Sequence, residues 1–372
     1  MSNQHPVLMA IDDGSGNIAT RLLKGNGEAF ETKTISCIVD KVLPALDSGI
    51  SSEAWETNGK QFTVVKTSTD SLNTCSKDYQ LSDMNRVLVH NAIATTVGEH
   101  PVYLGVTLPT EQFYNRGSDD IINSSRIEAK RQNIMIECNN VSGMYPKANI
   151  VGVKVYPEAI PAYVYCSVND DGSANAAYPE EHTTLIIDLG RYTCDLAIIS
   201  TGYAVTDYMT TDHGVQKLVD KFKVLLQQNS KELGLSDISA FSQTYVDQVI
   251  DLGYIGSTLE TPNAIAARKD VTHLVQQAKE YLNELVLADA MALCKNDFSM
   301  LTRIVFVGGG ANWLNELSQQ WFHTVDIPTN PEMAVVRGTH KMLINSQEKI
   351  FKELGLDVQQ EEQLTLVENE AK

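Results

Sequence analysis

Two stretches of the sequence place an aspartate at the end of an apolar run and beside a glycine turn. Residues 7–11 are apolar and lead into DDGSG, and residues 185–187 are apolar and lead into DLGRYTCD. Apolar runs of this kind are typical of buried strands, and glycine lets the backbone turn back sharply. Asp12 and Asp188 therefore lie at strand ends beside tight turns. Two such turns predict a phosphate that is bound from both sides.

These residue types suit phosphoryl transfer, which needs charge neutralisation and alignment more than a covalent nucleophile. Turn amides and the hydroxyls of Ser15 and Thr193 can donate to phosphate oxygens. Asp12 and Asp188 would repel a bare polyphosphate, so their position predicts a divalent cation, Mg²⁺, held through water molecules. Glu158 follows a predicted strand, in the first turn of a helix, where it can orient the attacking water or accept its proton.

A third glycine turn follows the predicted strand at 303–307. Residues 308–310 are all glycine, and a helix is expected at 313–322. Glycine removes the side chains that would block a base or ribose, so this turn suits an adenosine.

A dinucleotide-binding fingerprint is an alternative interpretation of the first turn. Gly14, Gly16 and Ala19 fit the spacing GxGxxA, and a strand precedes them. That motif needs a long helix whose N-terminus faces the pyrophosphate. Residues 17–24 instead predict a strand that ends at the turn Gly25-Asn26-Gly27, with a return strand at 29–38. We therefore prefer a hairpin around the first turn.

Hydrophobic periodicity predicts the other main elements. Further strands are expected at 61–66, 102–108, 151–156, 196–200 and 203–208. Helices are expected at 83–96, 124–131, 215–226, 271–294 and 331–344, with a short one possible at 349–354. We interpret the basic residues Arg126, Lys130 and Arg131 of the helix at 124–131 as a solvated face. Small Ala334 and Gly338, four residues apart, predict close packing of the helix at 331–344.

Composition restricts the class of protein. A chain of 372 residues with 43% hydrophobic residues is long enough for two domains. The six cysteines form no CxxC pair and the eight histidines no HExxH motif, so we expect reduced thiols and any metal to be held by oxygen. A net charge of -18 disfavours direct binding to nucleic acid. No apolar run is long enough to span a membrane, so a cytoplasmic protein is expected.

In combination, these motifs resemble the actin, chaperone and sugar-kinase superfamily, and within it the plasmid-segregation actins of the ParM (StbA) family. The resemblance extends to about residue 345. Its segments are IDDGSGNI at 11–18, VTLPTEQFYNR at 106–116, VYPEAIPA at 155–162, LIIDLGRYTCD at 185–195, VFVGGGA at 305–311 and PEMAVVRGTHKM at 331–342. The first, third and fourth are similar to the first phosphate motif, the first connecting helix and the second phosphate motif.

The resemblance implies an α/β actin-like fold, in which two ribonuclease-H-like domains flank a nucleotide cleft. Domain I would comprise residues 1–181 and 331–350, with an inserted subdomain at 40–80; domain II would comprise 182–330, and an acidic tail 351–372. ATP, with GTP as the alternative, and Mg²⁺ would occupy the cleft. The implied catalytic residues are Glu158, Asp188 and Asp12, of which Asp12 and Asp188 would also hold the metal. The implied nucleotide contacts are Asp13, Gly14, Ser15, Gly16, Asn17, Gly190, Arg191, Tyr192, Thr193, Gly214, Lys217, Gly308, Gly309, Gly310 and Ala311.

Two positions depart from the family pattern. Ala19 stands where the first loop often leads to a lysine, so that positive charge is missing or comes from Arg21. Arg191 and Tyr192 follow Gly190, where the family usually has glycine and threonine. Arg191 either replaces the missing cation or points to solvent.

The function that the resemblance implies is a filament-forming ATPase that segregates low-copy plasmids. It would bind DNA through a centromere-binding adaptor, in keeping with its acidic charge, and would contact neither nucleic acid nor membrane directly. The alternatives are a sugar- or acetate-type kinase, a chromosomal cell-shape or division actin, and a chaperone-type ATPase domain. The chaperone-type domain is disfavoured because we expect no peptide-binding domain after residue 345, and a membrane-bound division actin because we expect no basic amphipathic helix at either terminus.

Overall fold

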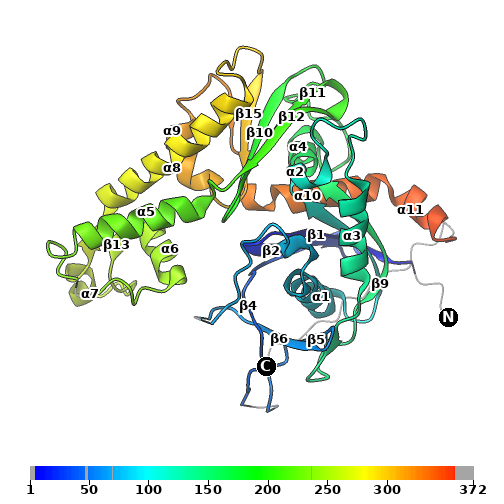
Figure 1. Cartoon of the computed structure of the whole chain (residues 1–372), viewed down its shortest axis with the longest axis horizontal. Helices are drawn as coiled ribbons and strands as arrows, with labels where there is room; N and C mark the ends of the chain where they lie inside the picture. Colours follow the sequence, from blue (N-terminus) through cyan, green and yellow to red (C-terminus); the bar gives the residue numbers. More distant parts are fainter. Residues whose placement is uncertain (1–4, 47–48, 69, 236, 357–372) are drawn as a thin grey trace.

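The computed structural model describes residues 5–46, 49–68, 70–235 and 237–356 of the chain. Two five-stranded sheets form the centres of two lobes (Figure 1). The first, in the order β3-β2-β1-β7-β9, consists of β1 (Val7–Asp13), β2 (Asn17–Leu23), β3 (Ala29–Ile35), β7 (Pro101–Leu108) and β9 (Asn149–Pro157). The second, in the order β12-β11-β10-β15-β16, consists of β10 (Thr184–Leu189), β11 (Cys194–Ser200), β12 (Ala204–Thr211), β15 (Arg303–Val307) and β16 (Val325–Asp326).

Both sheets follow one plan. In each, the first three strands form an antiparallel meander, and the next two strands pair in parallel beside the first. The strand that follows each glycine turn therefore pairs back onto the strand before it. This confirms the predicted hairpins and excludes the dinucleotide fingerprint, because β2 occupies the place where that motif needs a helix.

A smaller sheet, in the order β4-β6-β5-β8, belongs to the first lobe. It consists of β4 (Ile38–Val39), β5 (Ala54–Thr57), β6 (Lys60–Val64) and β8 (Asn139–Asn140). Helix α1 (Asp83–Val97) lies between this sheet and the main one (Figure 1). Because β4 precedes residue 40 and β8 comes from a distant part of the chain, the small sheet extends beyond the inserted subdomain expected at 40–80, for which only the strand at 61–66 was predicted.

The remaining elements cover the sheets and connect the lobes. The first lobe also has α2 (Thr110–Phe113), α3 (Ser124–Met135) and the 3-10 turn η1 (Tyr79–Leu81). The second has α5 (Val215–Gln228), α6 (Gln243–Leu252), α7 (Pro262–Ala266), α8 (Thr272–Leu293), α9 (Asn315–Ser318), the strands β13 (Tyr254–Ile255) and β14 (Lys269–Asp270), and the 3-10 turns η2 (Thr201–Tyr203) and η3 (Ala311–Leu314). Helices α4 (Ala159–Ser167) and α10 (Ala334–Asn345), with the turn η4 (Pro331–Met333), lie between the lobes, and α11 (Gln347–Glu353) follows α10.

The two connecting helices pack closely at a glycine. A Cβ atom built on Gly338 would lie 1.8 Å from the carbonyl oxygen of Pro161 in α4. No side chain fits at this distance, so glycine lets the backbones of α4 and α10 touch. This confirms the close packing expected from Ala334 and Gly338.

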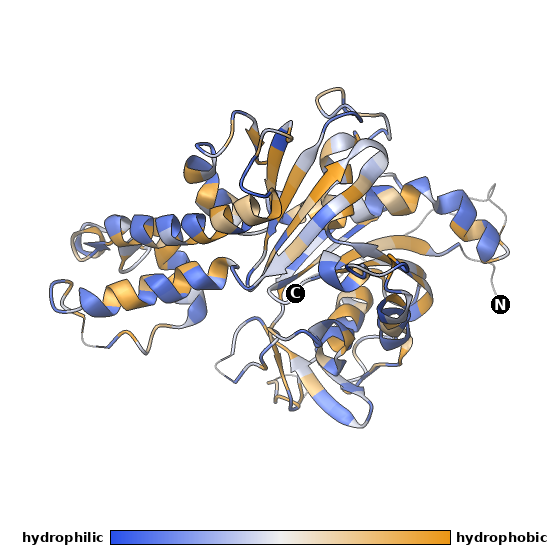
Figure 2. Cartoon of the chain, turned by 45° about the horizontal axis from the view of Figure 1, so that its top comes forward, coloured by the Kyte–Doolittle hydropathy of each residue, from blue (hydrophilic) through white to orange (hydrophobic). Residues whose placement is uncertain are grey.

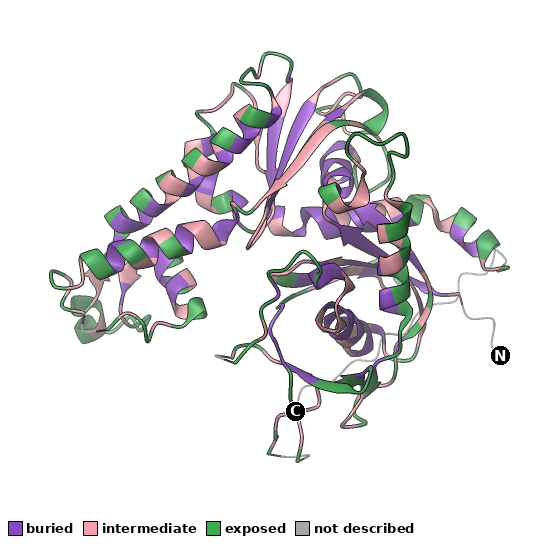
Figure 3. Ribbon diagram, viewed as in Figure 1, coloured by how far each residue is buried: buried purple, intermediate pink, exposed green. Residues whose placement is uncertain are grey.

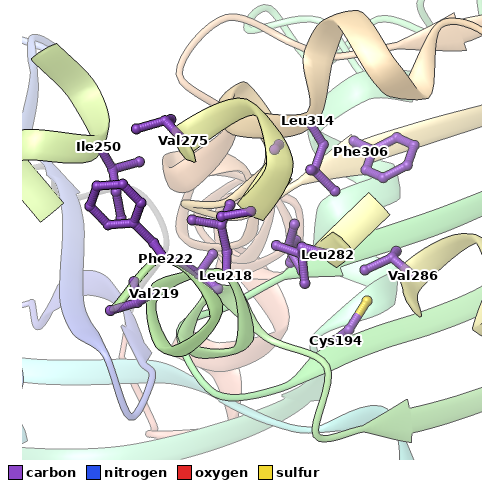
Figure 4. Close-up of a cluster of buried hydrophobic side chains, with 14 of the residues drawn as sticks. Cys194, Leu218, Val219, Phe222, Ile250, Val275, Leu282, Val286, Phe306 and Leu314 are labelled. Atoms are coloured by element: carbon purple, nitrogen blue, oxygen red, sulfur yellow. The ribbon is translucent and has the colours of Figure 1, made fainter. Parts of the chain in front are cut away.

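The core of the second lobe lies between its sheet and the helices α5 and α8. Apolar residues recur along one face of α5 in the sequence, and that face is buried, whereas the opposite face is polar (Figures 2 and 3). Phe222 of α5, Leu282 of α8 and Cys194, the first residue of β11, all belong to this core (Figure 4). The second glycine turn is therefore anchored at its end in the core.

Two expectations about helices were wrong. The helix expected at 313–322 is only the turn η3 followed by the short α9. Lys130 does not lie on a solvated face of α3, because its side chain has no exposed surface. Residues 357–372 of the predicted acidic tail lie outside the described residues. The short helix expected at 349–354 corresponds to α11, at Gln347–Glu353. No described helix has the length and hydropathy needed to cross a membrane.

Candidate functional site

The first loop, residues 14–17, connects β1 to β2. Its carbonyl oxygens accept hydrogen bonds from behind: Ser36 Oγ donates to Gly14 (2.7 Å), and Thr74 Oγ1 donates to Ser15 (2.7 Å). The backbone N-H of Ser36 donates to the Gly16 carbonyl (3.0 Å). The amides of Ser15 and Gly16, by contrast, donate to no group in the described part of the chain. Two amide donors of this loop are therefore available to an anion.

The second loop, residues 190–193, is built in the same way. Helix α5 begins directly behind it, and the amides of Val215 and Gln216 donate to the carbonyls of Gly190 (3.0 Å) and Arg191 (2.8 Å). The amides of Arg191, Tyr192 and Thr193 have no acceptor among the described residues. Both loops thus have satisfied carbonyl groups and unsatisfied N-H groups, which is the pattern of a phosphate-binding nest.

The loops approach each other across the two lobes. A Cβ atom built on Gly16 would lie 2.6 Å from Cβ of Arg191. A residue larger than glycine at position 16 would therefore push the second loop away. The structure brings together the two glycine turns that the sequence singled out.

A group of carboxylates lies beside the loops. Glu158 is buried at the N-cap position of α4, and its pKa lies well above the usual range because of burial and the charges of Asp195, Asp12 and Asp188. Burial and the neighbouring Asp13 raise the pKa of Asp12 to about 7. Burial, with Asp12 and Asp195 nearby, also raises the pKa of Asp188. The three acids predicted from the sequence are therefore close enough to repel one another.

Asp195 is a further member of this group that sequence reasoning missed. It lies in β11, opposite Asp188 in the strand register, and is almost completely buried. Burial raises its pKa to about 6, although Thr210 Oγ1 donates a hydrogen bond to it (2.5 Å). The sequence feature that could have revealed it is a charged residue within an otherwise apolar strand, seven residues after Asp188. Its neighbour Cys194 had drawn no functional interpretation either.

Carboxylate oxygens are typical Mg²⁺ ligands, but these acids do not converge on one point. Within the described ranges, no group of three or more histidine, cysteine, aspartate or glutamate side chains is arranged to hold a metal ion directly. The arrangement is compatible with a cation that the carboxylates contact through water, as the sequence suggested.

The triple glycine turn has one open position. A Cβ atom on Gly308, whose φ is +84°, would lie 2.3 Å from Oδ1 of Asp188, and one on Gly310 would lie 2.4 Å from Val215 Cγ2. A Cβ atom on Gly309 would meet nothing within 4 Å. Gly308 and Gly310 therefore permit close packing, whereas Gly309 faces open space. Ala311 is completely buried in the core of the second lobe, so only its backbone can contact a ligand.

Gly214 and Lys217 begin α5 beside the second loop. A Cβ atom on Gly214 would lie 2.4 Å from the backbone of Tyr192, so this glycine lets the helix start pack against the loop. Lys217 Nζ donates to Asp212 (2.7 Å), and this hydrogen bond raises the lysine pKa. Asn17, at the end of the first loop, is exposed.

The structure places Asp13 and Arg21 differently from the positions that the sequence suggested. The Asp13 side chain is buried beneath the first loop and contacts Lys130, so it does not reach a ligand in front of the loop. Arg21 contacts Glu31 and lines a cavity of about 1310 Å³ beside α10 and α11, which includes no residue of the loops. It does not replace the lysine that is missing at Ala19.

Arg191 neither points to solvent nor lies free. Its side chain is 16% exposed, and its Nη1 contacts both carboxylate oxygens of Asp247 at 3.1 and 3.0 Å. Its Nε donates to Gln216 Oε1 (3.1 Å). The expectation that Arg191 points to solvent, one of the two alternatives, is therefore wrong.

Comparison with solved structures shows the same fold in several actin homologues. The actin-like protein Alp7A has a TM-score of 0.71 at 14% identity, over 94% of this chain and 99% of that chain. An archaeal actin homolog in complex with ADP has a TM-score of 0.67 at 15% identity, over 91% and 100%. A 15-stranded ParM filament from Clostridium botulinum has a TM-score of 0.64 at 17% identity, over 92% and 100%.

Family models match both lobes. Residues 7–171 match the N-terminal model of the plasmid segregation protein ParM (StbA), and residues 186–319 match the C-terminal model of the archaeal MreB-like actin homologue. A search of curated sequences gave no significant match. The two matches confirm the resemblance inferred from the motifs, and the solved structures confirm the expected two-domain actin-like fold: residues 7–171 are similar to the N-terminal part of ParM (StbA), and residues 186–319 to the C-terminal part of an archaeal MreB-like actin homologue.

Proposed function

We propose that this protein is an actin-like ATPase that assembles into filaments when it binds ATP and so segregates low-copy plasmids. The observation that carries the proposal is the pair of opposed loops, each with unpaired amides, that meet at Gly16 and Arg191. Two anion-binding nests that face each other fit a polyphosphate better than a single phosphate. The ADP complex of an archaeal homologue and the ParM filament of Clostridium botulinum, which have the same fold, support a nucleotide and self-assembly.

In this proposal the residues of the two loops bind and align the phosphates. The amides of Ser15 and Gly16 donate from the first lobe, and those of Tyr192 and Thr193 donate from the second. Gly309, whose open side meets no protein atom, leaves room for the adenosine. GTP remains the alternative nucleotide. Binding on both lobes at once would hold them in one relative position, which is how nucleotide occupancy would control assembly.

Glu158 is the residue we assign to proton transfer. Burial and the neighbouring aspartates raise the pKa of Glu158, so its carboxylate is a stronger base than that of an ordinary glutamate and can accept a proton from the attacking water. Asp12 and Asp188 lie at the ends of β1 and β10 and contribute negative charge to the same site. Mg²⁺ held through water by these two aspartates would offset that charge and the charge of the polyphosphate.

The DNA contact would run through a basic adaptor that binds the centromere. A chain with net charge -18 cannot release counterions from DNA as a cluster of lysines and arginines does. Filament growth between two adaptor-bound plasmids would then push them apart.

Light scattering and pelleting with ATP, with ADP and without nucleotide test the proposal. We expect assembly with ATP and disassembly as ATP is hydrolysed. Failure to assemble with any nucleotide, across salt and protein concentration, would reject the filament function. ATP hydrolysis that occurs only with an added sugar or acetate would indicate a small-molecule kinase instead.

A further inference from the structure

Arg191 combines two tethered donors with one that has no partner. It is the only lysine or arginine in residues 12–17 and 188–195, which form the loops and the strand ends beside them. Its Nη1 and Nε are held by Asp247 of α6 and Gln216 of α5. Its Nη2 is buried and has no hydrogen-bond partner among the described residues.

A buried donor without a partner is costly, by about 1–3 kcal/mol for a typical group and more for a charged one. Such groups in native structures usually have a ligand, ion or water as their partner. The position of Arg191 indicates which partner: its backbone amide is one of the unpaired donors of the second loop, and its Cβ faces the first loop. An anion bound between the loops would therefore lie beside this guanidinium.

The neighbouring cations have other partners. Lys130 is buried behind the first loop against Asp13, Arg21 contacts Glu31, and Lys217 contacts Asp212. The lysine that often follows the first loop is replaced by Ala19, which is buried. Arg191 is thus a positively charged residue of the loops with an N-H group, at Nη2, that has no partner among the described residues.

We propose that Arg191 binds the terminal phosphate of a nucleoside triphosphate through Nη2, while Asp247 and Gln216 position its guanidinium. The proposal rests on the proposed function, because it assumes a nucleotide between the loops. A diphosphate lacks the group that Nη2 would contact, so Arg191 makes the site selective for the triphosphate. Because Asp247 lies in α6, the same guanidinium would connect the bound terminal phosphate to the position of α6 in the second lobe.

Asp247 is suited to a positioning role. Gln243 Nε2 donates to its Oδ1 (3.0 Å), so the carboxylate is itself oriented within α6. Asp247 holds Nη1 and Gln216 holds Nε, so two points of the guanidinium are fixed and with them the direction of Nη2.

The test compares the affinities of Arg191→Ala and wild-type protein for a non-hydrolysable ATP analogue and for ADP, by calorimetry with Mg²⁺. Arg268→Ala is the matched control, because Arg268 has a 17% exposed side chain, pairs with Glu260 at 2.6 Å and lies in the same lobe. We expect Arg191→Ala to weaken the triphosphate analogue about tenfold or more, as for the loss of a charged hydrogen bond, and to leave ADP within about threefold. Arg268→Ala should change neither affinity.

Asp247→Asn gives a second test in which Arg191 remains. The analogue should bind more weakly than to wild type but more tightly than to Arg191→Ala, again with ADP unchanged. An equal loss for both nucleotides, or no loss for the analogue, would overturn the role of Arg191 while leaving the proposed function intact. A wild-type protein that binds neither nucleotide would reject the proposed function itself.

Discussion

Lys130 Nζ contacts a carboxylate oxygen of Asp13 in a site where neither side chain has any exposed surface. The ammonium group also contacts Gln80 Oε1 and donates to Asn85 Oδ1 at 2.9 Å. Asn85 in turn donates to the same Asp13 oxygen at 2.7 Å. The pair connects α3 to the end of β1, directly behind the first loop. An internal positive charge therefore balances the second aspartate of the DD pair.

Replacing Lys130 by methionine should destabilise the fold strongly. The carboxylate of Asp13 would remain buried without its counter-charge, and breaking a buried pair in this way costs about 3–5 kcal/mol. Urea unfolding followed by circular dichroism measures the change.

The double variant Asp13→Asn with Lys130→Met is the control, since it removes both charges and keeps similar volumes. It should recover most of the loss, because a neutral pair leaves no unpaired ion. If the single variant is as stable as the double variant, the buried pair does not hold the loop.

The burial of Lys130 shows where sequence reasoning failed. Three basic residues on α3 were interpreted together as a solvated face, although Lys130 lies three residues after Ile127 and four before Ile134. Residues at these spacings share one face of a helix, and Ile134 is completely buried. The position of Lys130 on the apolar face was therefore visible in the sequence. Its partner was not, because Asp13 lies 117 residues away.

The predictable parts of the fold and site depended on short-range patterns. The hairpins around the loops follow from apolar runs interrupted by glycine, and the contact between α4 and α10 follows from Gly338. The contact of Arg191 with Asp247 joins residues 56 positions apart, on a helix, α6, that was not predicted. Contacts between distant residues are set by tertiary packing, which a single sequence does not encode in any local pattern.

The raised pKa of Asp12 predicts that stability falls as the pH rises from about 4 through 7, and levels off above that. An acid whose pKa is about 7 in the folded state, against 3.8 ordinarily, binds its proton more tightly when folded. Its contribution is therefore present at low pH and is lost as the pH rises through 7. Glu158 and Asp188 shift in the same direction.

Two buried histidines require the measurement to be made above pH 6.5. Burial lowers the pKa values of His90 and His340 to about 4, so they make stability rise with pH between about 4 and 6.5. Between pH 6.5 and 8.5, in EDTA and without nucleotide, urea unfolding should show a loss of roughly 1 kcal/mol from Asp12 alone. Asp12→Asn should reduce this slope, and an unchanged slope would contradict the assignment.

Gly338→Ala should destabilise the protein, because the new Cβ would overlap the Pro161 carbonyl and force α4 and α10 apart. Overpacking of this kind costs about 1–3 kcal/mol, or more where backbones must move. Gly309→Ala makes the same chemical change at a position with no neighbour within 4 Å, so its thermal stability should match wild type. Equal melting temperatures for both variants would show that the connecting helices tolerate separation.

Glu158→Gln should slow ATP hydrolysis by about 100-fold or more, because glutamine orients a water molecule but cannot accept its proton. The loss of hydrolysis must be distinguished from the effect of misfolding, and the stability of the variant allows this. Burial and four neighbouring aspartates raise the free energy of ionised Glu158, so a neutral side chain of the same shape relieves that repulsion. The variant should therefore be more stable than wild type at pH 8 while it hydrolyses ATP more slowly.

Glu332→Gln, which removes a half-buried carboxylate paired with Lys33, should leave the hydrolysis rate unchanged. Hydrolysis at the wild-type rate by Glu158→Gln would exclude Glu158 as the base, and a variant both slow and unstable would attribute the loss to folding.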